Sequence, residues 1–193
     1  MKKSICVYCA SSSRIDEKYY KAADELGRLI AATGSTLVFG GGARGAMGRL
    51  ADAALAAGGR VVGVMPRFMI ELEWAHPGCS ELIITEGMHE RKARLIENVD
   101  AVVALPGGSG TLEELIETVT LKRLGQFLKP IVLVNIDGFY DPLVQQYNRC
   151  IEENFMDERH HQMWSVVESP AKVFAAIDGA AAWSSDAHRF AAI

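Results

Sequence analysis

The sequence lacks any hydrophobic run of the roughly 18 residues that a membrane-spanning helix requires. The apolar part of its start, MKKSICVYCASSS, is also too short for the core of a signal peptide. An excess of positive charge is missing as well, because 20 Lys and Arg stand against 24 Asp and Glu, a formal net charge of −4. That balance argues against nucleic acid or a membrane surface as the main partner. We therefore expect a cytoplasmic protein with neither of these partners.

Cysteine is scarce, with four residues in the chain, and no second CxxC or HxxxH follows Cys6-x-x-Cys9. We interpret the cysteines as free thiols in a reducing compartment, in preference to a redox pair or half of a zinc site. The pair His160-His161 belongs to no metal-ligand motif, so we expect no metal.

Proline is also scarce, with 6 residues against 18 glycines, and 49% of the chain is hydrophobic. This composition favours a folded domain with tight turns over a disordered chain. The length of 193 residues is typical of one domain, which we place at 1–193 with its core at about 5–178. The tail 179–193 is poorly patterned, and we expect it to fray or to pack on a neighbouring subunit.

Short apolar runs alternate with longer amphipathic segments along the chain. Continuous apolar runs are typical of strands covered on both faces, and strand–helix alternation predicts a parallel sheet with right-handed crossovers. We therefore predict a Rossmann-like, three-layer α/β/α fold with a mostly parallel sheet of about six or seven strands. The predicted strands are 4–8, 36–39, 60–65, 82–85, 101–105, 130–135 and 165–167, and the predicted helices are 16–32, 45–57, 89–98, 111–124, 141–153 and 170–178.

Three strand ends carry loops suited to a ligand, which in such sheets binds beyond the carboxyl ends of the strands. These loops are 9–13 (CASSS), 40–48 (GGGARGAMG) and 106–111 (PGGSGT). Glycine lets a ligand approach backbone N–H groups, and a helix that begins directly afterwards adds unpaired donors and a positive dipole end. The loops therefore predict a phosphorylated ligand. We take Ser12, Gly41, Gly42 and Ser109 as candidate contacts.

Neither glycine loop is a nucleoside triphosphate loop, because no GKS or GKT follows the glycines. Gly40-x-Gly42-x-x-Gly45 formally matches the dinucleotide fingerprint. However, it follows the second strand, and Val64-Met65-Pro66 stands where a ribose-binding acid would be expected. We therefore do not predict a dinucleotide site.

Charged residues stand beside these loops. Glu114 fits a capping box with Thr111, or alternatively lies at the pocket floor within reach of a sugar hydroxyl or water. Arg91 and Lys92 open a helix, where cations oppose the dipole, so an anion is expected opposite them. Arg91 could bind a phosphate or carboxylate through two parallel hydrogen bonds, or it could form a surface ion pair with Glu90 or Glu97.

Four ordered motifs together resemble one known family. PGGxGTxxE is matched at 106–114, GGGxxGxMG at 40–48, and the stretches Met88-His89-Glu90-Arg91-Lys92 and Cys6-Val7-Tyr8-Cys9-Ala10-Ser11-Ser12-Ser13 supply the other two. Over about residues 5–178 the chain resembles the LOG (Lonely Guy) family, the cytokinin riboside 5'-monophosphate phosphoribohydrolases, often labelled lysine decarboxylases. Two departures are Leu121-Lys122-Arg123-Leu124-Gly125 where W-x-Q-L-G is common, and Ala10 where glycine is usual. They bear on base preference and subunit contacts.

The resemblance implies a homodimer without an organic cofactor. It implies hydrolysis of N6-substituted AMP, and for some members AMP, to the free base and ribose 5-phosphate. It also implies that Arg91 and Glu114 are the catalytic pair. The other implied substrate contacts are Lys92, Gly107, Gly108, Gly110 and Thr111 at the phosphoribosyl site, with Glu73 toward the base and Met88 beside the arginine motif.

Three alternatives remain beside this hypothesis. A non-catalytic nucleotide sensor or carrier would share the fold and the glycine loops. A lysine decarboxylase would need pyridoxal phosphate bound to a lysine, and no lysine stands at a strand-end loop. A purely structural protein would leave the phosphate-type loops unexplained.

Overall fold

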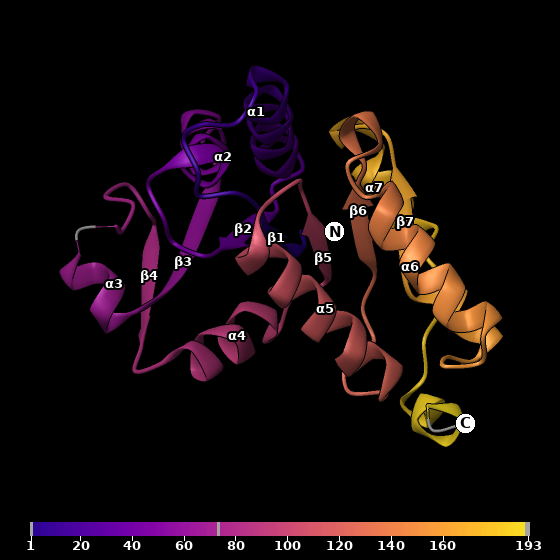
Figure 1. Cartoon of the computed structure of the whole chain (residues 1–193). Helices are drawn as coiled ribbons and strands as arrows, with labels where there is room; N and C mark the ends of the chain where they lie inside the picture. The colour runs from indigo at the N-terminus through magenta and orange to yellow at the C-terminus, as the bar shows by residue number, and fades with distance from the viewer. Residues whose placement is uncertain (1, 73, 192–193) are drawn as a thin grey trace.

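The computed structural model describes residues 2–72 and 74–191, and its strands form one parallel sheet (Figure 1). The strand order is β4-β3-β2-β1-β5-β6-β7, which confirms the predicted α/β class and parallel sheet. The strands are β1 Ser4–Tyr8, β2 Thr36–Phe39, β3 Arg60–Pro66, β4 Glu81–Thr85, β5 Ala101–Ala104, β6 Ile131–Val134 and β7 Ser165–Val167.

Helices cover both faces of the sheet, giving the predicted three layers (Figure 1). One layer contains α1, α2 and α7, and the opposite layer contains α4, α5 and α6. The short α3 follows β3 at one end of the sheet. The helices are α1 Glu17–Ala32, α2 Gly45–Ala56, α3 Arg67–Glu71, α4 Met88–Ile96, α5 Ser109–Arg123, α6 Asp141–Glu152 and α7 Val173–Asp178.

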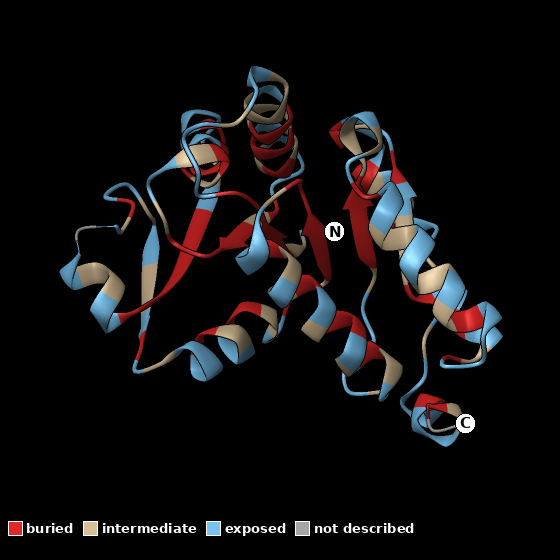
Figure 2. Ribbon diagram, in the orientation of Figure 1, coloured by how far each residue is buried: buried red, intermediate tan, exposed pale blue. Residues whose placement is uncertain are grey.

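The central strands are buried on both faces, which explains their continuous apolar sequences. In β1, Ile5 and Val7 pack toward α1 and α2, whereas Cys6 and Tyr8 pack toward α4 and α5. Figure 2 shows the central strands buried along most of their length, while the edge strand β4 is only partly buried. All four cysteines are free thiols, as expected.

The start of α5 differs from the prediction. We expected Thr111 to cap it, but the helix begins at Ser109 with Gly108 at the N-cap, where no side-chain hydrogen bond is made. The backbone of the glycine-rich loop therefore starts the helix without help from a capping side chain, and Thr111 is buried in its first turn. The capping-box interpretation of Glu114 is wrong, and its carboxylate is available for other contacts.

The C-terminal tail packs on its own chain as far as Ala191, so the expectation of fraying is wrong there. Trp183 Nε1 donates a hydrogen bond to the Lys122 carbonyl at 2.7 Å, and Arg123 donates to the Ala191 carbonyl. Local periodicity does not reveal these contacts, because the tail lies along the end of α5, which is distant in sequence. Trp183 and Lys122, for example, are 61 residues apart.

Across residues 2–72 and 74–191, no helix combines the length and apolar character needed to cross a membrane.

The strand order reverses between β1 and β5, which lie side by side at the centre of the sheet. At such a switch point the connections from the two strands lead away to opposite faces and leave a crevice beyond their carboxyl ends. The loops after β1, β2 and β5 all lie at this edge, so the three loops singled out from the sequence come together.

Candidate active site

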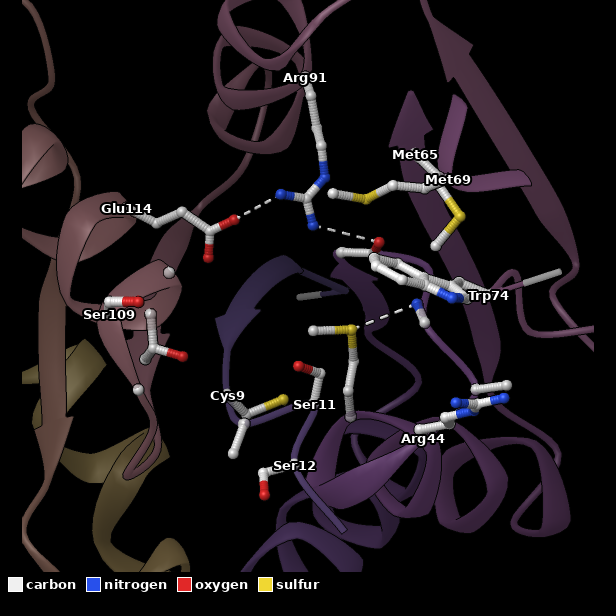
Figure 3. A pocket seen from close by; sticks show the side chains of 18 of the residues that line it. Cys9, Ser11, Ser12, Arg44, Met65, Met69, Trp74, Arg91, Ser109 and Glu114 are labelled. Carbon is white, nitrogen blue, oxygen red and sulfur yellow. Dashed lines mark hydrogen bonds and ion pairs between the residues drawn. The ribbon is translucent and has the colours of Figure 1, made fainter. Parts of the chain in front are cut away.

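A cavity of about 450 Å³ lies at the carboxyl edge of the sheet, where the three loops meet (Figure 3). The ends of β1, β2, β3 and β5 and the starts of α2, α4 and α5 contribute to its wall. The lining residues are Cys9, Ala10, Ser11, Ser12, Gly40, Gly42, Ala43, Arg44, Met47, Met65, Met69, Trp74, Met88, Arg91, Gly108, Ser109, Gly110, Thr111 and Glu114.

Arg91, in the first turns of α4, is 6% exposed and is held by three acceptors. Its Nε donates to the Val64 carbonyl at 3.1 Å, its Nη2 to the Gly40 carbonyl at 3.2 Å, and its Nη1 to Glu114 Oε1 at 2.9 Å. A Cβ on residue 40 would lie 2.3 Å from Nη2, so only glycine allows this approach. The guanidinium therefore has a fixed position, and the predicted surface pair with Glu90 or Glu97 is wrong, because those two pair with Arg94.

Glu114, on α5, faces Arg91 in a nearly enclosed site, with its side chain 11% exposed. Burial raises the pKa of this carboxyl above its ordinary value, and the charge of Arg91 partly opposes that rise. Only Oε1 bonds to Arg91, and Figure 3 shows the other oxygen pointing away from the guanidinium. A carboxylate with one anchored oxygen and one directed elsewhere can contact a sugar or water.

A buried chain of hydroxyl groups supports the turn of α5 that carries Glu114. Thr118 Oγ1 donates to the Glu114 carbonyl at 2.8 Å, and the Tyr8 hydroxyl lies 2.9 Å from Thr118 Oγ1. Because the hydrogen of Thr118 is used on the carbonyl, Tyr8 donates to Thr118. Burial raises the pKa of Tyr8, so its hydroxyl stays neutral. The end of β1 thereby fixes the height of Glu114 above the sheet.

One end of the cavity is suited to a phosphate. The first-turn N–H groups of Ser109, Gly110 and Thr111 in α5 have no acceptor within the helix, and they stand at its positive dipole end. The Ser109 and Ser12 hydroxyl groups are also in the wall. This arrangement provides hydrogen-bond donors for an anion without a lysine in the lining.

The other end of the cavity is apolar. Met65, Met69 and Trp74 lie together on the far side of Arg91 from Ser109 and Glu114 (Figure 3). The sequence favours packing for Trp74, with a place at the border of a pocket as the alternative; the structure puts its side chain in the cavity wall, and the residue is 42% exposed. A flat, apolar group would find contacts at this end of the cavity, and a negatively charged group would find hydrogen-bond donors at the end formed by α5.

The structure brings most of the predicted site residues into this wall: Ser12, Gly42, Met88, Arg91, Gly108, Ser109, Gly110, Thr111 and Glu114. Lys92 is not among them, because it points along α5 to Glu113 and, at 3.2 Å, to Glu117. The anion expected opposite these cations is thus supplied by the protein itself. Gly41 and Gly107 are not among the lining residues. Glu73 is outside the described residues.

Residues that the sequence interpretation missed are mainly apolar. Met65 follows the rule for strand ends, since it stands at the end of β3, and that position could have flagged it. Within the described ranges, no three His, Cys, Asp or Glu side chains are grouped so as to hold a metal ion. The lining residues outside the predicted loops that were not named as candidates are Met65, Met69 and Trp74, and those within the predicted loops are Cys9, Ala10, Ser11, Gly40, Ala43, Arg44 and Met47.

Comparison with known proteins decides the family. The profile of a family described as "Possible lysine decarboxylase" matches residues 47–177. The chain is 42% identical over 156 residues to the cytokinin riboside 5'-monophosphate phosphoribohydrolase LOG of Oryza sativa subsp. japonica, a match that covers 81% of this chain and 64% of the rice protein. It is 39% identical over 172 residues to a probable enzyme of the same name, LOGL9, from the same plant, covering 89% and 76%. The chain belongs to the LOG family.

Solved structures share the fold of this chain. A molybdenum cofactor binding protein from Rippkaea orientalis superimposes with a TM-score of 0.70 at 23% identity, covering 92% of this chain and 96% of that one. The molybdenum cofactor carrier protein of Chlamydomonas reinhardtii gives 0.69 at 24% identity, covering 92% and 97%. At these identities the likeness establishes the fold alone.

Proposed function

We propose that this LOG-family protein is a nucleoside 5'-monophosphate phosphoribohydrolase. It hydrolyses the N-glycosidic bond of N6-modified AMP, a cytokinin riboside 5'-monophosphate, and of AMP, and it releases the free base and ribose 5-phosphate. The main support is the Arg91–Glu114 pair, which lies between the phosphate-type end and the apolar end of one cavity. The names of the rice relatives support the same activity.

The order of groups along the cavity matches the order of groups in such a nucleotide. The phosphate lies at the first turn of α5, against the N–H groups of Ser109, Gly110 and Thr111. The base lies against Met65 and Trp74. The ribose, which joins phosphate and base, is thereby placed beside Glu114 and Arg91.

The reaction needs a negative charge near the sugar, because breaking the bond from the base builds positive charge on the ribose. The ionised Glu114 carboxylate stabilises that charge, and its oxygen not bound to Arg91 orients or deprotonates the attacking water. The water oxygen bonds to the ribose carbon as the bond to the base breaks, and the departing base takes up one proton, so that nucleotide and water give free base and ribose 5-phosphate. Arg91 holds the carboxylate in place through the bond at 2.9 Å and keeps positive charge beside the departing base.

The pH dependence of the reaction should report Glu114. Its pKa is raised by burial, so the carboxylate that catalysis needs is lost at a higher pH than for an exposed glutamate. Activity should therefore fall as pH decreases, with the midpoint of kcat/KM above the ordinary glutamate value of about 4.3. A pH profile with AMP checks this, and an acid limb at or below that value would contradict the role of Glu114.

The activity itself is tested with a panel of nucleoside monophosphates. Incubation with AMP and with N6-isopentenyl-AMP should give free base and ribose 5-phosphate in equal amounts, measured by chromatography. Formation of adenosine and inorganic phosphate from AMP would contradict the proposal. Release of the base from a nucleoside that carries no 5'-phosphate would contradict it as well. Tight nucleotide binding without any base release would instead identify a carrier or sensor.

We also propose a homodimer in the cytoplasm. Three large apolar side chains are exposed in this part of the chain, and they support a contact between subunits: Ile116 on α5, Leu124 just after α5, and Phe155 after α6. The free state of all four cysteines supports a reducing compartment. Sedimentation equilibrium tests the dimer, which a single species of 21.0 kDa at micromolar concentration would rule out.

A further inference from the structure

A short segment after α3, Trp74 to Gly78, is attached to the glycine loop after β2. The Trp74 carbonyl accepts a hydrogen bond from Ala43 N at 3.0 Å, and His76 N donates to the Gly41 carbonyl at 2.8 Å. These two bonds form an antiparallel bridge between Gly42 and Ala75. The segment therefore closes the apolar end of the cavity with Trp74 as its cavity-facing side chain.

The side chain of His76 fixes this segment from behind. It is 6% exposed, and its Nδ1 accepts a hydrogen bond from Gly78 N at 3.1 Å. A backbone N–H can only donate, so the imidazole hydrogen is on Nε2, which lies 3.1 Å from Asp52 Oδ1 on α2. The ring also packs edge-on against Phe39 at the end of β2. Every polar atom of the ring thus has a partner in the protein, and none faces the cavity.

We propose that His76 is a positioning residue, held by Asp52, and that it sets Trp74 as the surface against which the base of the nucleotide packs. This inference rests on the proposed function, because it requires the base to lie at the apolar end of the cavity. Aromatic side chains bind bases through their flat faces without requiring a particular base, so Trp74 accepts adenine and N6-modified adenine alike. His76 affects affinity for the base and leaves the phosphate end untouched.

The test separates binding of the base from binding of the sugar phosphate. In a Glu114→Gln background, in which turnover is expected to be strongly slowed, the dissociation constants of AMP and of ribose 5-phosphate are measured by calorimetry. His76→Ala and Trp74→Ala should each weaken AMP binding by about tenfold, the size expected for loss of one base–aromatic contact. Binding of ribose 5-phosphate should change by less than twofold in both. Equal changes for the two ligands, or no change for AMP, would overturn the proposal.

A matched pair of variants tests the role of Asp52 if His76→Ala fails to fold. Asp52 is largely exposed, with 69% of its side chain accessible, so its replacement leaves the core intact. Asp52→Ala removes the acceptor for His76 Nε2 and should weaken AMP binding by roughly two- to fivefold, whereas Asp52→Asn keeps an acceptor and should restore it. Identical AMP affinity in the two variants would overturn the role of Asp52.

Failure of this inference and failure of the proposed function have different signatures. If the wild-type protein binds AMP but releases no base, the proposed activity is wrong while the dependence of AMP affinity on His76 can still be measured. If base is released and AMP affinity is independent of His76 and Trp74, the activity stands and the inference is wrong. Quenching of tryptophan fluorescence by AMP, lost in Trp74→Phe and absent with ribose 5-phosphate, gives a second readout of the same contact.

Discussion

Replacing Glu114 with glutamine should lower the rate of base release from AMP by at least about 100-fold, the contribution typical of one positioned acid or base. Glutamine has nearly the same shape and can still accept the hydrogen bond from Arg91, but it carries no negative charge to stabilise the ribose cation. Affinity for AMP should remain within about threefold, because the phosphate and base contacts are unchanged. Single-turnover kinetics and calorimetry measure the two quantities separately.

The neighbouring residue provides a matched control. Glu113 also lies in the first turns of α5, but its carboxylate is turned away from the cavity toward Lys92. Glu113→Gln makes the same chemical change one position away and should keep near-normal turnover. If Glu114→Gln retained wild-type turnover, or if the two variants lost activity equally, the assignment of Glu114 as the catalytic carboxylate would be wrong.

Replacing Arg91 with alanine should reduce turnover at least tenfold and also destabilise the fold. The buried Glu114 would lose its partner, and breaking a buried pair typically costs about 3–5 kcal/mol. Arg91 lowers the pKa of Glu114, so its removal should raise that pKa further and move the acid limb of the activity profile to higher pH. Thermal unfolding and a pH profile of kcat/KM measure both effects.

Arg94, one turn further along α4, is the control for that variant. It is exposed, and among the described residues its ion pairs are with Glu90 and Glu97, so Arg94→Ala should change neither stability nor turnover appreciably. Arg91→Lys keeps the charge but cannot reach three acceptors at once, and it should recover part of the stability and little of the activity. An Arg91→Ala protein with normal turnover would move the role of the second catalytic group to another residue.

The sequence predicts the sheet well because its central strands are covered on both faces. Successive residues of β1 and β2 point to opposite faces of the sheet, and both faces are buried, so both strands are largely apolar. The predicted bounds of these two strands agree with the structure. The motif residues Arg91 and Glu114 are 23 positions apart in the sequence, yet in the structure Arg91 Nη1 lies 2.9 Å from Glu114 Oε1. Parallel strands bring successive loops to one edge, and this rule allows such a meeting to be predicted.

Other features depend on contacts that no local pattern encodes. Lys92 follows Arg91 directly, but neighbouring residues on a helix point about 100° apart, so Lys92 faces α5 while Arg91 faces the cavity. Trp74 lies in the wall because its segment pairs with the loop at Gly42, more than 30 positions earlier in the chain. Short elements such as α3 have too few residues to show periodicity.

The three hydrogen bonds of Arg91 have a consequence for how such a protein changes over evolutionary time. The guanidinium that we propose to lie beside the reacting sugar also joins the ends of β2 and β3, through the carbonyls of Gly40 and Val64. Mutational loss of this arginine therefore removes a cross-strand tie together with the chemistry, and selection for a folded chain would act against it. Glu114 makes no such cross-strand tie, so we expect a descendant that abandons hydrolysis and keeps its ligand to lose the carboxylate first and to retain the arginine.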